Sequence, residues 1–380
     1  MTLRTLQIGM GWFTEQPGGL NRVYAHLVSE LAAMGVETYG LVAGTPDVER
    51  ASGGLARAFA RGNAPLVKRL LGVRRAALPW LRTHESSAVI VSHFAQHALP
   101  LLDVTRRNPF VVHFQGPWGR ESRLEGDSLL SMLAKEVVER SVYRRADAAI
   151  VLSNAFADIL AVRFGVQRDR IHVIPGGVEY SRFAIVRARA DCRAELNWPT
   201  DRPIVLCVRR LVRRVGVDVL IDAVVEIRRR VPDVLILIAG KGAMRDELDE
   251  KIAALGLGDT VRLLGFIPDE LLPVAYRAAD LSVVPSTALE GFGLITVESL
   301  AAGTPCIVTP VGGLAGIVTP FAPQLVAQST SAAHIADTIS GALLGELAMP
   351  TSEQCATYAR TNFDWPVIAR RVRAVYEGVA

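Results

Sequence analysis

The sequence predicts an α/β protein made of two doubly wound, parallel-sheet domains. Short runs rich in Val and Ile alternate with longer helical patterns, as in parallel strands joined by crossover helices. The alternation stops between Glu179 and Pro203, where charged residues replace the apolar runs, and then restarts. A chain of 380 residues, half of them hydrophobic, can bury two cores of ordinary size. The expected parts are a Rossmann-like domain over residues 1–178, a linker over 179–202, a second such domain over 203–362, and a helix over 363–380 that packs back on the first domain.

The first half of the chain carries six predicted strands. They lie at Thr5–Gly11, Thr38–Ala43, Ala88–Ser92, Pro109–Gln115, Ala148–Leu152 and Ile171–Pro175. Helices are predicted between them at Gly19–Met34, Leu129–Arg145 and Ala155–Phe164.

The second half repeats this architecture without repeating the sequence. Strands are predicted at Ile204–Val208, Val234–Ile238, Val261–Leu264, Leu281–Val284 and Cys306–Thr309, and helices at Val217–Arg230, Met244–Leu255, Glu270–Ala278, Phe292–Ala302 and Trp365–Val379. Ligands of open α/β sheets bind beyond the carboxyl ends of the strands, so two facing units of this kind are expected to share a cleft.

The composition limits the class of protein. A net charge of +4 is too small to indicate nucleic-acid binding, and it suits an anionic substrate or a peripheral contact with acidic lipid. The four cysteines are scattered without metal-binding spacing, which favours reduced thiols. No run approaches 18 apolar residues, and the first ten residues indicate a strand and not a signal peptide. We therefore expect a soluble, cytoplasmic protein.

The segment from Arg57 to Arg82 departs from the pattern. It holds seven basic residues interleaved with Leu, Val, Ala and Trp80. A basic amphipathic helix of this kind binds an anionic membrane or a lipid-linked acceptor, and a solvated helical face has the same composition. Both interpretations stay open.

The segment Glu290–Glu298 (EGFGLITVE) is a strong candidate for a ligand site. It follows the predicted strand Leu281–Val284 and opens a helix at a glycine-rich turn. Free backbone N–H groups and the positive end of the helix dipole suit a phosphate, and Gly291 and Gly293 permit close approach. A capped helix with one solvent-facing carboxylate would give the same pattern.

A cluster of arginines follows the predicted strand Ile204–Val208. The segment Arg209–Gly216 (RRLVRRVG) holds four of them, with Arg210 just beyond the strand. Such a cluster is costly unless an anion neutralises it, and Arg binds phosphate oxygens in a bidentate manner. A solvated basic loop is the alternative.

Two further glycine turns lie where nucleotides bind in such folds. Gly18 and Gly19 join the first predicted strand to the first helix, and Gly240 follows the strand Val234–Ile238. Neither turn is a G-x-G-x-x-G fingerprint, which disfavours an NAD-dependent enzyme.

His113 lies near the carboxyl end of a predicted strand. It either hydrogen-bonds a sugar hydroxyl or is a structural histidine. His93 and His97 have the spacing of metal ligands on a helix, but no third ligand accompanies them, and no Asp-x-Asp pair occurs. We therefore expect no metal site, with basic side chains and helix ends stabilising a leaving group instead.

These residues resemble the family 4 glycosyltransferases, which are retaining enzymes with the GT-B fold. The resemblance covers most of the chain and is clearest from Ile171 to Gly313. The segment Val173–Glu179 (VIPGGVE) is similar to the family's inter-domain segment. Glu290–Glu298 matches the family's carboxylate pair, and the familiar Ala302–Val308 (AGTPCIV) follows it.

The resemblance implies a role for each candidate residue. Glu298 is expected to hold the nucleotide ribose and Glu290 to contact the transferred sugar. The backbone that contacts this sugar and the diphosphate is expected at Phe292, Gly293, Leu294 and Ile295. The remaining expected contacts are Gly18 and Gly19 with the phosphates, Phe266 and Ile267 with the base near Gly240, and His113 with the reacting sugar.

One departure from the family pattern concerns the diphosphate. The family pairs an Arg with a Lys five residues later, and here Arg210 is followed by Val215. Arg214 or Arg213 would have to replace that charge, with the forked geometry of a guanidinium.

The expected function is a retaining glycosyltransfer without a metal or other cofactor. The donor would be a UDP-sugar or GDP-sugar, and the acceptor a glycan, a lipid-linked sugar or a small molecule, as in polysaccharide pathways. Because of Val215, a sugar-nucleotide-binding protein with little transferase activity is an alternative. A sugar-nucleotide epimerase of the same fold is another.

Overall fold

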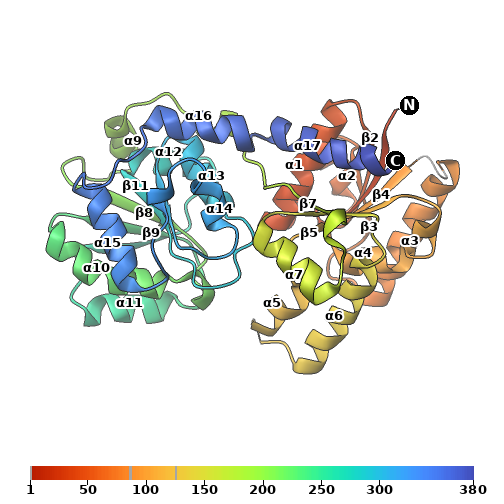
Figure 1. Cartoon of the computed structure of the whole chain (residues 1–380), viewed down its shortest axis with the longest axis horizontal. Coiled ribbons are helices and arrows are strands. Elements are labelled where there is room, and N and C mark those ends of the chain that lie inside the picture. Colours follow the sequence, from red (N-terminus) through yellow and green to blue (C-terminus); the bar gives the residue numbers. More distant parts are fainter. Residues whose placement is uncertain (1, 85–87, 125) are drawn as a thin grey trace. The chain divides into compact units, whose positions relative to one another are not determined.

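The computed structural model describes residues 2–84, 88–124 and 126–380, so Met1, which begins the first predicted domain, lies outside it. The chain forms two compact units. Residues up to 176 and residues 365–380 make the first, and Gly177–Asp364 make the second. Each unit is built on one sheet with helices around it (Figure 1). Every strand pair in both sheets is parallel, which confirms the predicted doubly wound α/β class.

The first unit has a sheet of seven strands in the order β3-β2-β1-β4-β5-β6-β7. The order reverses at β1, as in doubly wound folds. The strands are β1 Arg4–Gly11, β2 Glu37–Ala43, β3 Ala56–Ala60, β4 Ala88–Ser92, β5 Phe110–Phe114, β6 Ala148–Val151 and β7 Ile171–Val173.

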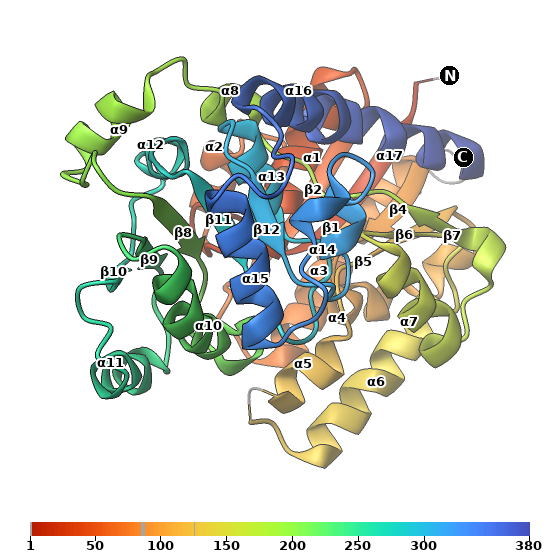
Figure 2. The same ribbon diagram turned by 60° about the vertical axis from the view of Figure 1, so that its left-hand side comes forward.

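Helices cover both faces of this sheet. They are α1 Gly19–Ala33, α2 Asp47–Ala51, α3 Leu66–Thr83, α4 Ala95–Ala98, α5 Trp118–Leu124, α6 Leu129–Tyr143, α7 Asn154–Phe164 and α17 Trp365–Val379. The helices α1 and α17 lie side by side (Figures 1 and 2). The helices α3, α4, α6 and α7 contribute to the main hydrophobic core.

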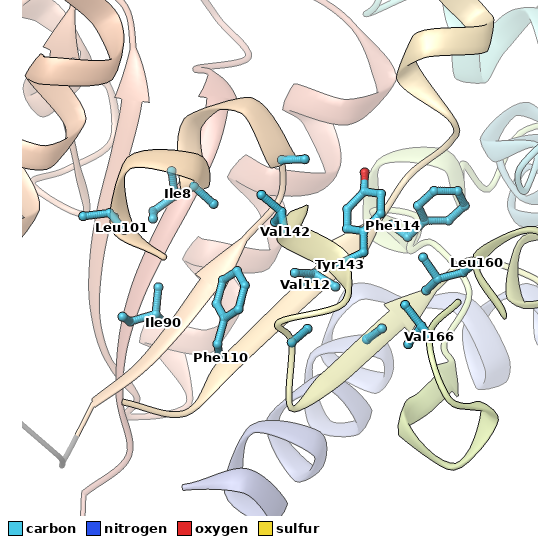
Figure 3. Packing of buried hydrophobic residues seen from close by; sticks show 14 of the residues in the cluster. Ile8, Ile90, Leu101, Phe110, Val112, Phe114, Val142, Tyr143, Leu160 and Val166 are labelled. Atoms are coloured by element: carbon cyan, nitrogen blue, oxygen red, sulfur yellow. The ribbon is translucent and has the colours of Figure 1, made fainter. Parts of the chain in front are cut away.

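Strand β5 shows how the period of two sorts side chains between these faces. Phe110, Val112 and Phe114 enter the main core beside Val142 and Leu160 (Figure 3). The residues between them, Val111 and His113, therefore point to the opposite face. The strand is buried along its whole length, so its sequence shows no regular alternation of apolar and polar residues that would distinguish the two faces.

The second unit has a sheet of five strands in the order β10-β9-β8-β11-β12. The strands are β8 Ile204–Val208, β9 Leu235–Ala239, β10 Val261–Gly265, β11 Leu281–Val284 and β12 Cys306–Val308. The helices are α8 Tyr180–Phe183, α9 Arg189–Glu195, α10 Val217–Arg230, α11 Arg245–Ala254, α12 Leu272–Ala278, α13 Leu294–Ala301, α14 Leu314–Val318, α15 Ala332–Leu343 and α16 Ser352–Phe363. Helix α10 packs against α11 and α15, and α13 packs against α12 and α16 (Figure 2).

Two segments differ from the prediction. The basic stretch Arg57–Arg82 is not one helix, because β3 occupies Ala56–Ala60 and α3 begins only at Leu66, after Pro65. Proline suits this position because it has no backbone N–H and its φ is fixed. Residues 179–202, predicted as a linker, contain α8 and α9, and both helices pack against α12 within the second unit.

The last helix, α17, belongs to the first unit. Trp365 stacks on His26 of α1 at a centroid distance of 5.3 Å, and Tyr376 is fully buried. Its hydroxyl lies 2.7 Å from Nε2 of His113. The helix therefore completes the face of the sheet opposite the main core.

The first unit buries three histidines around the ends of β1, β4 and β5. The His93 ring stacks on His113 at 4.2 Å, and its Nε2 lies 2.8 Å from Oε1 of Gln7. His97 contacts the Gly9 carbonyl through Nδ1 at 2.9 Å. Burial lowers the pKa of all three imidazoles, to about 3 for His113 and about 4 for His97, with the His113 ring adding to the effect at His93. These rings are therefore neutral at pH 7.

All four cysteines are buried and free of disulfides. Among the described helices, none is both long enough and apolar enough to cross a lipid bilayer.

The buried histidines predict a loss of stability in acid. The pKa of His97 is about 4 in the folded chain, against an ordinary value of 6.5. Between these two values the unfolded chain binds a proton at His97 and the folded chain does not, so the free energy of unfolding falls as the pH falls. Between pH 7.5 and 5.0 this group alone should remove on the order of 2 kcal/mol from the free energy of unfolding. We expect His97→Gln, measured by urea unfolding at both pH values, to lose less stability than the wild type.

Glu139 acts in the opposite sense, because burial raises the pKa of its carboxyl group to about 7. It is present in both proteins, so its contribution cancels in the comparison. Equal losses in the variant and the wild type would contradict the role given to His97.

Candidate functional site

The loops that follow the strands of the second sheet meet at its carboxyl edge. Arg209 follows β8, Gly240 follows β9 and Pro285 follows β11. Strands β9 and β11 flank β8 on either side, so these three loops are neighbours. They carry most of the candidate residues of the second half.

The loops after β8 and β9 touch through their backbones. Gly240 has a φ of 144°, its N–H donates to the Gly265 carbonyl at 2.6 Å, and a Cβ there would overlap the carbonyl oxygen of Arg209. The Leu211 N–H donates to the Lys241 carbonyl at 2.9 Å. Only glycine permits this approach, so Gly240 sets the course of the arginine loop.

Arg209 binds Glu290 directly. Its Nη2 donates to Oε2 of Glu290 at 2.6 Å and to Oγ of Ser286 at 2.8 Å, and Oγ of Ser286 donates to the same Oε2 at 2.9 Å. The two charged side chains are only 10% and 13% exposed. The carboxylate of Glu290 is therefore held by the arginine loop and by the loop after β11.

Arg214 fastens the same two loops at a second place. Its Nη1 donates to the Leu289 carbonyl at 3.0 Å, and its own carbonyl accepts from the Thr287 N–H at 3.0 Å. Leu289 has a φ of 48°, which is unusual for a residue with a side chain. Arg214 therefore lies against the turn that leads into Glu290.

The other two arginines of the loop diverge. Arg213 is exposed and pairs with both carboxylate oxygens of Glu247, at 2.8 and 3.0 Å. Arg210 is exposed, and the described part of the chain offers its side chain neither an ion pair nor a hydrogen bond. The expectation that an anion neutralises the whole cluster is corrected: among the described residues, carboxylates pair with Arg209 and Arg213 and a carbonyl oxygen accepts from Arg214, so Arg210 is the one side chain of the cluster without such a partner.

Val215 is part of the core and only 2% exposed. A side chain here points away from solvent, so no charge reaches the site from this position. Of the two arginines considered as replacements, Arg214 reaches the Glu290 turn and Arg213 does not.

The turn after Glu290 leads into helix α13. Gly293 adopts a left-handed φ of 97°, and α13 begins at Leu294, two residues after the predicted start. Phe292 is buried and its ring lies 5.9 Å from that of Phe363, whereas Leu294 and Ile295 are half-buried. The N–H groups of Leu294 and Ile295 belong to the first turn, where a helix supplies no carbonyl partner. Such N–H groups suit a bound anion, and the expected contact of these two with a diphosphate stays a prediction.

Glu298 lies within α13 and is buried, at 8% exposed. Its Oε2 is 3.4 Å from the hydroxyl of Tyr276 in α12. Burial first, and then the Glu298 carboxylate, raise the pKa of Tyr276 well above its usual value. The phenol therefore stays protonated and serves as a donor.

The loop after β10 presents an aromatic ring to solvent. Phe266 is 59% exposed, and Nζ of Lys241 lies 5.4 Å from the centre of its ring. Ile267 beside it is half-buried. An exposed phenyl ring with a cation nearby is suited to stacking on a flat heterocycle.

Family models match both halves of the chain. Residues 188–362 match the model described as glycosyl transferases group 1, and residues 17–182 match the model described as glycosyltransferase family 4. The chain belongs to the group 1 glycosyltransferases.

Individual relatives match part of the chain. A D-inositol 3-phosphate glycosyltransferase from Nocardia farcinica is 38% identical over 58% of this chain and 50% of its own. A mannosylfructose-phosphate synthase from Agrobacterium fabrum is 32% identical over 63% of this chain and 55% of its own. The chain thus spans about half the length of the curated relatives it matches.

The fold of the chain is GT-B. The crystal structure of HepE from Anabaena in complex with UDP matches it with a TM-score of 0.80, at 19% identity, over 99% of this chain and 100% of that one. At this identity the likeness concerns the fold alone.

The candidates from the first unit lie on β5 and at the start of α1. Gly18 precedes α1, and a Cβ there would meet no atom within 4 Å; Gly19 is the first residue of that helix. His113 is 6% exposed, and its known contacts are Tyr376 and His93. These are the contacts of a structural histidine, the alternative left open by the sequence, and a role at a sugar stays a prediction.

Metal ligands do not gather among the residues that the structure describes, where no three His, Cys, Asp or Glu side chains come together. His93 precedes α4 and His97 lies in it, and each contacts a different group. Metal independence remains a prediction.

Three residues of this site were not expected from the sequence: Arg209, Ser286 and Tyr276. Arg209 stands next to Arg210 in the same motif, and spacing cannot tell which of two adjacent side chains points to a loop from a distant strand. Ser286 is close to Glu290 in sequence, so a short polar residue before the carboxylate was the available signal.

Gly312 supports the Glu290 turn and offers a test of it. Its φ is 57°, and a Cβ there would overlap the Glu290 carbonyl oxygen, which also accepts from the Gly313 N–H at 2.9 Å. We expect Gly312→Ala to lower the free energy of unfolding by about 2 kcal/mol or more, because the left-handed backbone alone costs an L-residue about 1–2 kcal/mol. Thermal or urea unfolding measures the change.

Gly316 provides the matched control. It lies four residues later in α14, and a Cβ there would meet no atom within 4 Å. Gly316→Ala should be neutral or stabilise the helix by up to about 1 kcal/mol. If both variants were equally stable, the proposed contact between Gly312 and the Glu290 turn would be wrong.

Proposed function

We propose that this protein is a retaining glycosyltransferase that moves a sugar from a UDP- or GDP-sugar to a hydroxyl group, without a metal ion. Membership of the group 1 family supports the reaction class. The observation that carries the proposal is the turn at Glu290, where a carboxylate, the N-terminus of α13 and the uncompensated Arg210 belong to neighbouring loops.

Leaving-group stabilisation is the main demand on such a site. The bond to the sugar breaks through an oxocarbenium-like state, and negative charge develops on the departing diphosphate. Arg210 has no ion pair or hydrogen bond with the described residues that would have to break. It is therefore the guanidinium proposed to meet this charge. The N–H groups of Leu294 and Ile295 supply dipoles at the end of α13. Arg214 stands in for the Lys of the family pattern.

The other candidate residues divide the donor between them. Glu298 is proposed to hold the ribose, and Glu290 the transferred sugar. The backbone beside Gly240 and the exposed Phe266 with Ile267 are proposed to meet the base. From the first unit, Gly18 and Gly19 are proposed for the phosphates and His113 for the reacting sugar.

The proton of the acceptor needs a base on the side from which the diphosphate leaves. In the proposed retaining reaction the acceptor hydroxyl attacks the anomeric carbon on that same face. A β-phosphate oxygen takes the proton as the hydroxyl oxygen bonds to carbon. This route fits a neutral His113, whose lowered pKa of about 3 leaves it uncharged at pH 7.

Two rivals use the same site. A protein that only binds sugar nucleotides would show neither transfer nor donor hydrolysis, and the buried Val215 keeps this rival open. An epimerase would convert the sugar nucleotide without an acceptor. The assays below separate all three.

Transfer assays with a panel of UDP- and GDP-sugars test the proposal. Arg210→Ala removes a charge that meets the developing diphosphate, and we expect kcat to fall by about 10²-fold or more. Arg214→Ala should cost more than Arg213→Ala, since only Arg214 contacts the Glu290 turn. Glu290→Gln should also lower turnover.

Arg229→Ala is the control for loss of an arginine, because this side chain is 71% exposed and, within the described residues, pairs with Glu226 of its own helix alone. Full turnover in both Arg210→Ala and Glu290→Gln would overturn the site assignment. Donor conversion without an acceptor would favour the epimerase.

The acceptor is proposed to be a glycan, a lipid-linked sugar or a small molecule. Helix α3 favours a membrane setting: Leu66, Val67 and Leu71 are 42%, 66% and 50% exposed, beside the exposed Lys68 and Arg75. Apolar and basic side chains on one exposed helix face suit an anionic lipid surface. We propose peripheral contact through this end of α3, and a cytoplasmic location remains a prediction.

Vesicle co-sedimentation tests this contact. Vesicles of mixed anionic and neutral phospholipid should bind the wild type, and Lys68→Glu/Arg75→Glu should weaken binding about tenfold or more, since each basic residue near the surface contributes about 1 kcal/mol. Arg50→Glu is the control, because Arg50 is 85% exposed in α2 of the same unit. Equal binding of wild type to purely neutral vesicles would contradict the proposal.

A further inference from the structure

The partnership of Arg209 with Glu290 has a consequence for how the donor sugar is held. We infer that Arg209 is a positioning residue: it takes no part in binding the diphosphate and instead fixes Oε2 of Glu290, so that Oε1 is presented to the sugar. This inference rests on the proposed function, and it gives a task to a residue that the family pattern does not name.

The two carboxylate oxygens of Glu290 differ in their contacts. Oε2 accepts from Nη2 of Arg209 and from the hydroxyl of Ser286. For Oε1 no hydrogen bond or ion pair is found in the part of the chain that the structure describes. A carboxylate with one oxygen saturated keeps acceptor capacity on the other, and a sugar hydroxyl is a donor of the right kind.

The position of the Arg209 guanidinium is also fixed from behind. The Arg209 N–H donates to the Ala239 carbonyl at 2.8 Å, and its own carbonyl lies against Gly240. Its side chain is 10% exposed, and its buried Nε has no hydrogen-bond partner among the residues that the structure describes. A buried donor without a hydrogen bond costs free energy. The hydrogen bonds of Nη2 with Glu290 and Ser286 offset this cost.

Glu290 needs such a tether because its own loop is irregular. It follows Leu289, whose φ is 48°, and it precedes the turn at Gly293. Neither residue places Glu290 in a helix or strand that would orient its side chain. The Arg209 guanidinium and the Ser286 hydroxyl supply that orientation through a short, charge-assisted contact.

This arrangement separates the tasks of two adjacent arginines. Arg210 is exposed, has no partner among the described residues, and meets the diphosphate. The charge of Arg209 is instead paired with that of Glu290. Loss of Arg209 should therefore weaken the grip on the sugar and leave the grip on the nucleotide unchanged. Loss of a residue that binds the diphosphate would weaken both.

Isothermal titration of the whole chain with UDP, UDP-glucose, GDP and GDP-mannose tests the inference, using whichever pair the wild type binds. For Arg209→Gln we expect the Kd of the nucleoside diphosphate to change less than threefold and the Kd of the sugar nucleotide to rise tenfold or more. Arg209→Lys should recover part of the loss, because an ammonium group still donates to Oε2. Arg229→Gln is the matched control and should leave both affinities unchanged.

A double-substitution cycle shows whether Arg209 acts through Glu290. The variant Arg209→Gln/Glu290→Gln should bind the sugar nucleotide no more weakly than Glu290→Gln alone. Ser286→Ala removes the second donor to Oε2 and should shift sugar-nucleotide affinity in the same direction by a smaller factor. It provides the test if Arg209→Gln does not fold, and unchanged affinity there would then overturn the inference.

Besides unchanged affinity in Ser286→Ala, three results would overturn the inference, and one of them also overturns the proposed function. Equal weakening of nucleotide and sugar nucleotide in Arg209→Gln would place Arg209 on the diphosphate. Additive losses in the double variant would show that it acts independently of Glu290. If the wild type bound none of the four probes, the proposed function would fail and the inference with it.

Discussion

The candidate site depends on close packing of backbone against backbone at two glycines. Gly240 lies against the carbonyl of Arg209, and Gly312 lies against the carbonyl of Glu290. A side chain at either position would push a loop away from the carboxyl edge of the second sheet. With both loops held, the side chains of Arg209 and Arg214 reach the turn before α13. The polar contacts of Arg209 and Arg214 thus depend on the absence of a side chain at Gly240 and Gly312.

This packing explains how four arginines are tolerated in six residues. Arg209 is paired with Glu290, Arg213 with Glu247, and Arg214 with a carbonyl oxygen. Carboxylates of the protein itself compensate two of the four positive charges. A count of charges in the sequence overstates the positive potential of such a loop, because it omits the carboxylates that come from a distant helix and a distant loop.

Several features of the fold and the site could be predicted from the sequence. The strands Ile204–Val208 and Leu281–Val284 and the helix Val217–Arg230 have the predicted bounds, because each is a strongly periodic or apolar segment between clear breaks. The strand Ala56–Ala60 was missed, since its short run of small residues with one Arg and one Phe resembles the basic helix that follows. The side of β5 that His113 occupies was also hidden, because a strand buried on both faces shows no alternation of polarity.

The pairing of Arg209 with Glu290 could not be predicted from the sequence, because it too depends on how distant elements pack. The two residues are 81 positions apart, and their contact depends on strands β8 and β11 lying next to each other. Spacing within a motif describes local geometry only. Which of two neighbouring arginines turns inward is decided by backbone contacts that no pattern of residue types records.

The placement of α17 makes the first unit discontinuous in sequence. Residues up to 176 need Trp365–Val379 to cover one face of their sheet, whereas the second unit is a single stretch from 177 to 364. During synthesis the second unit can therefore finish folding while the first still lacks its final helix. Until that helix is in place, the nascent first unit lacks the Tyr376 contact of His113 and leaves the neighbouring apolar surface of its sheet uncovered.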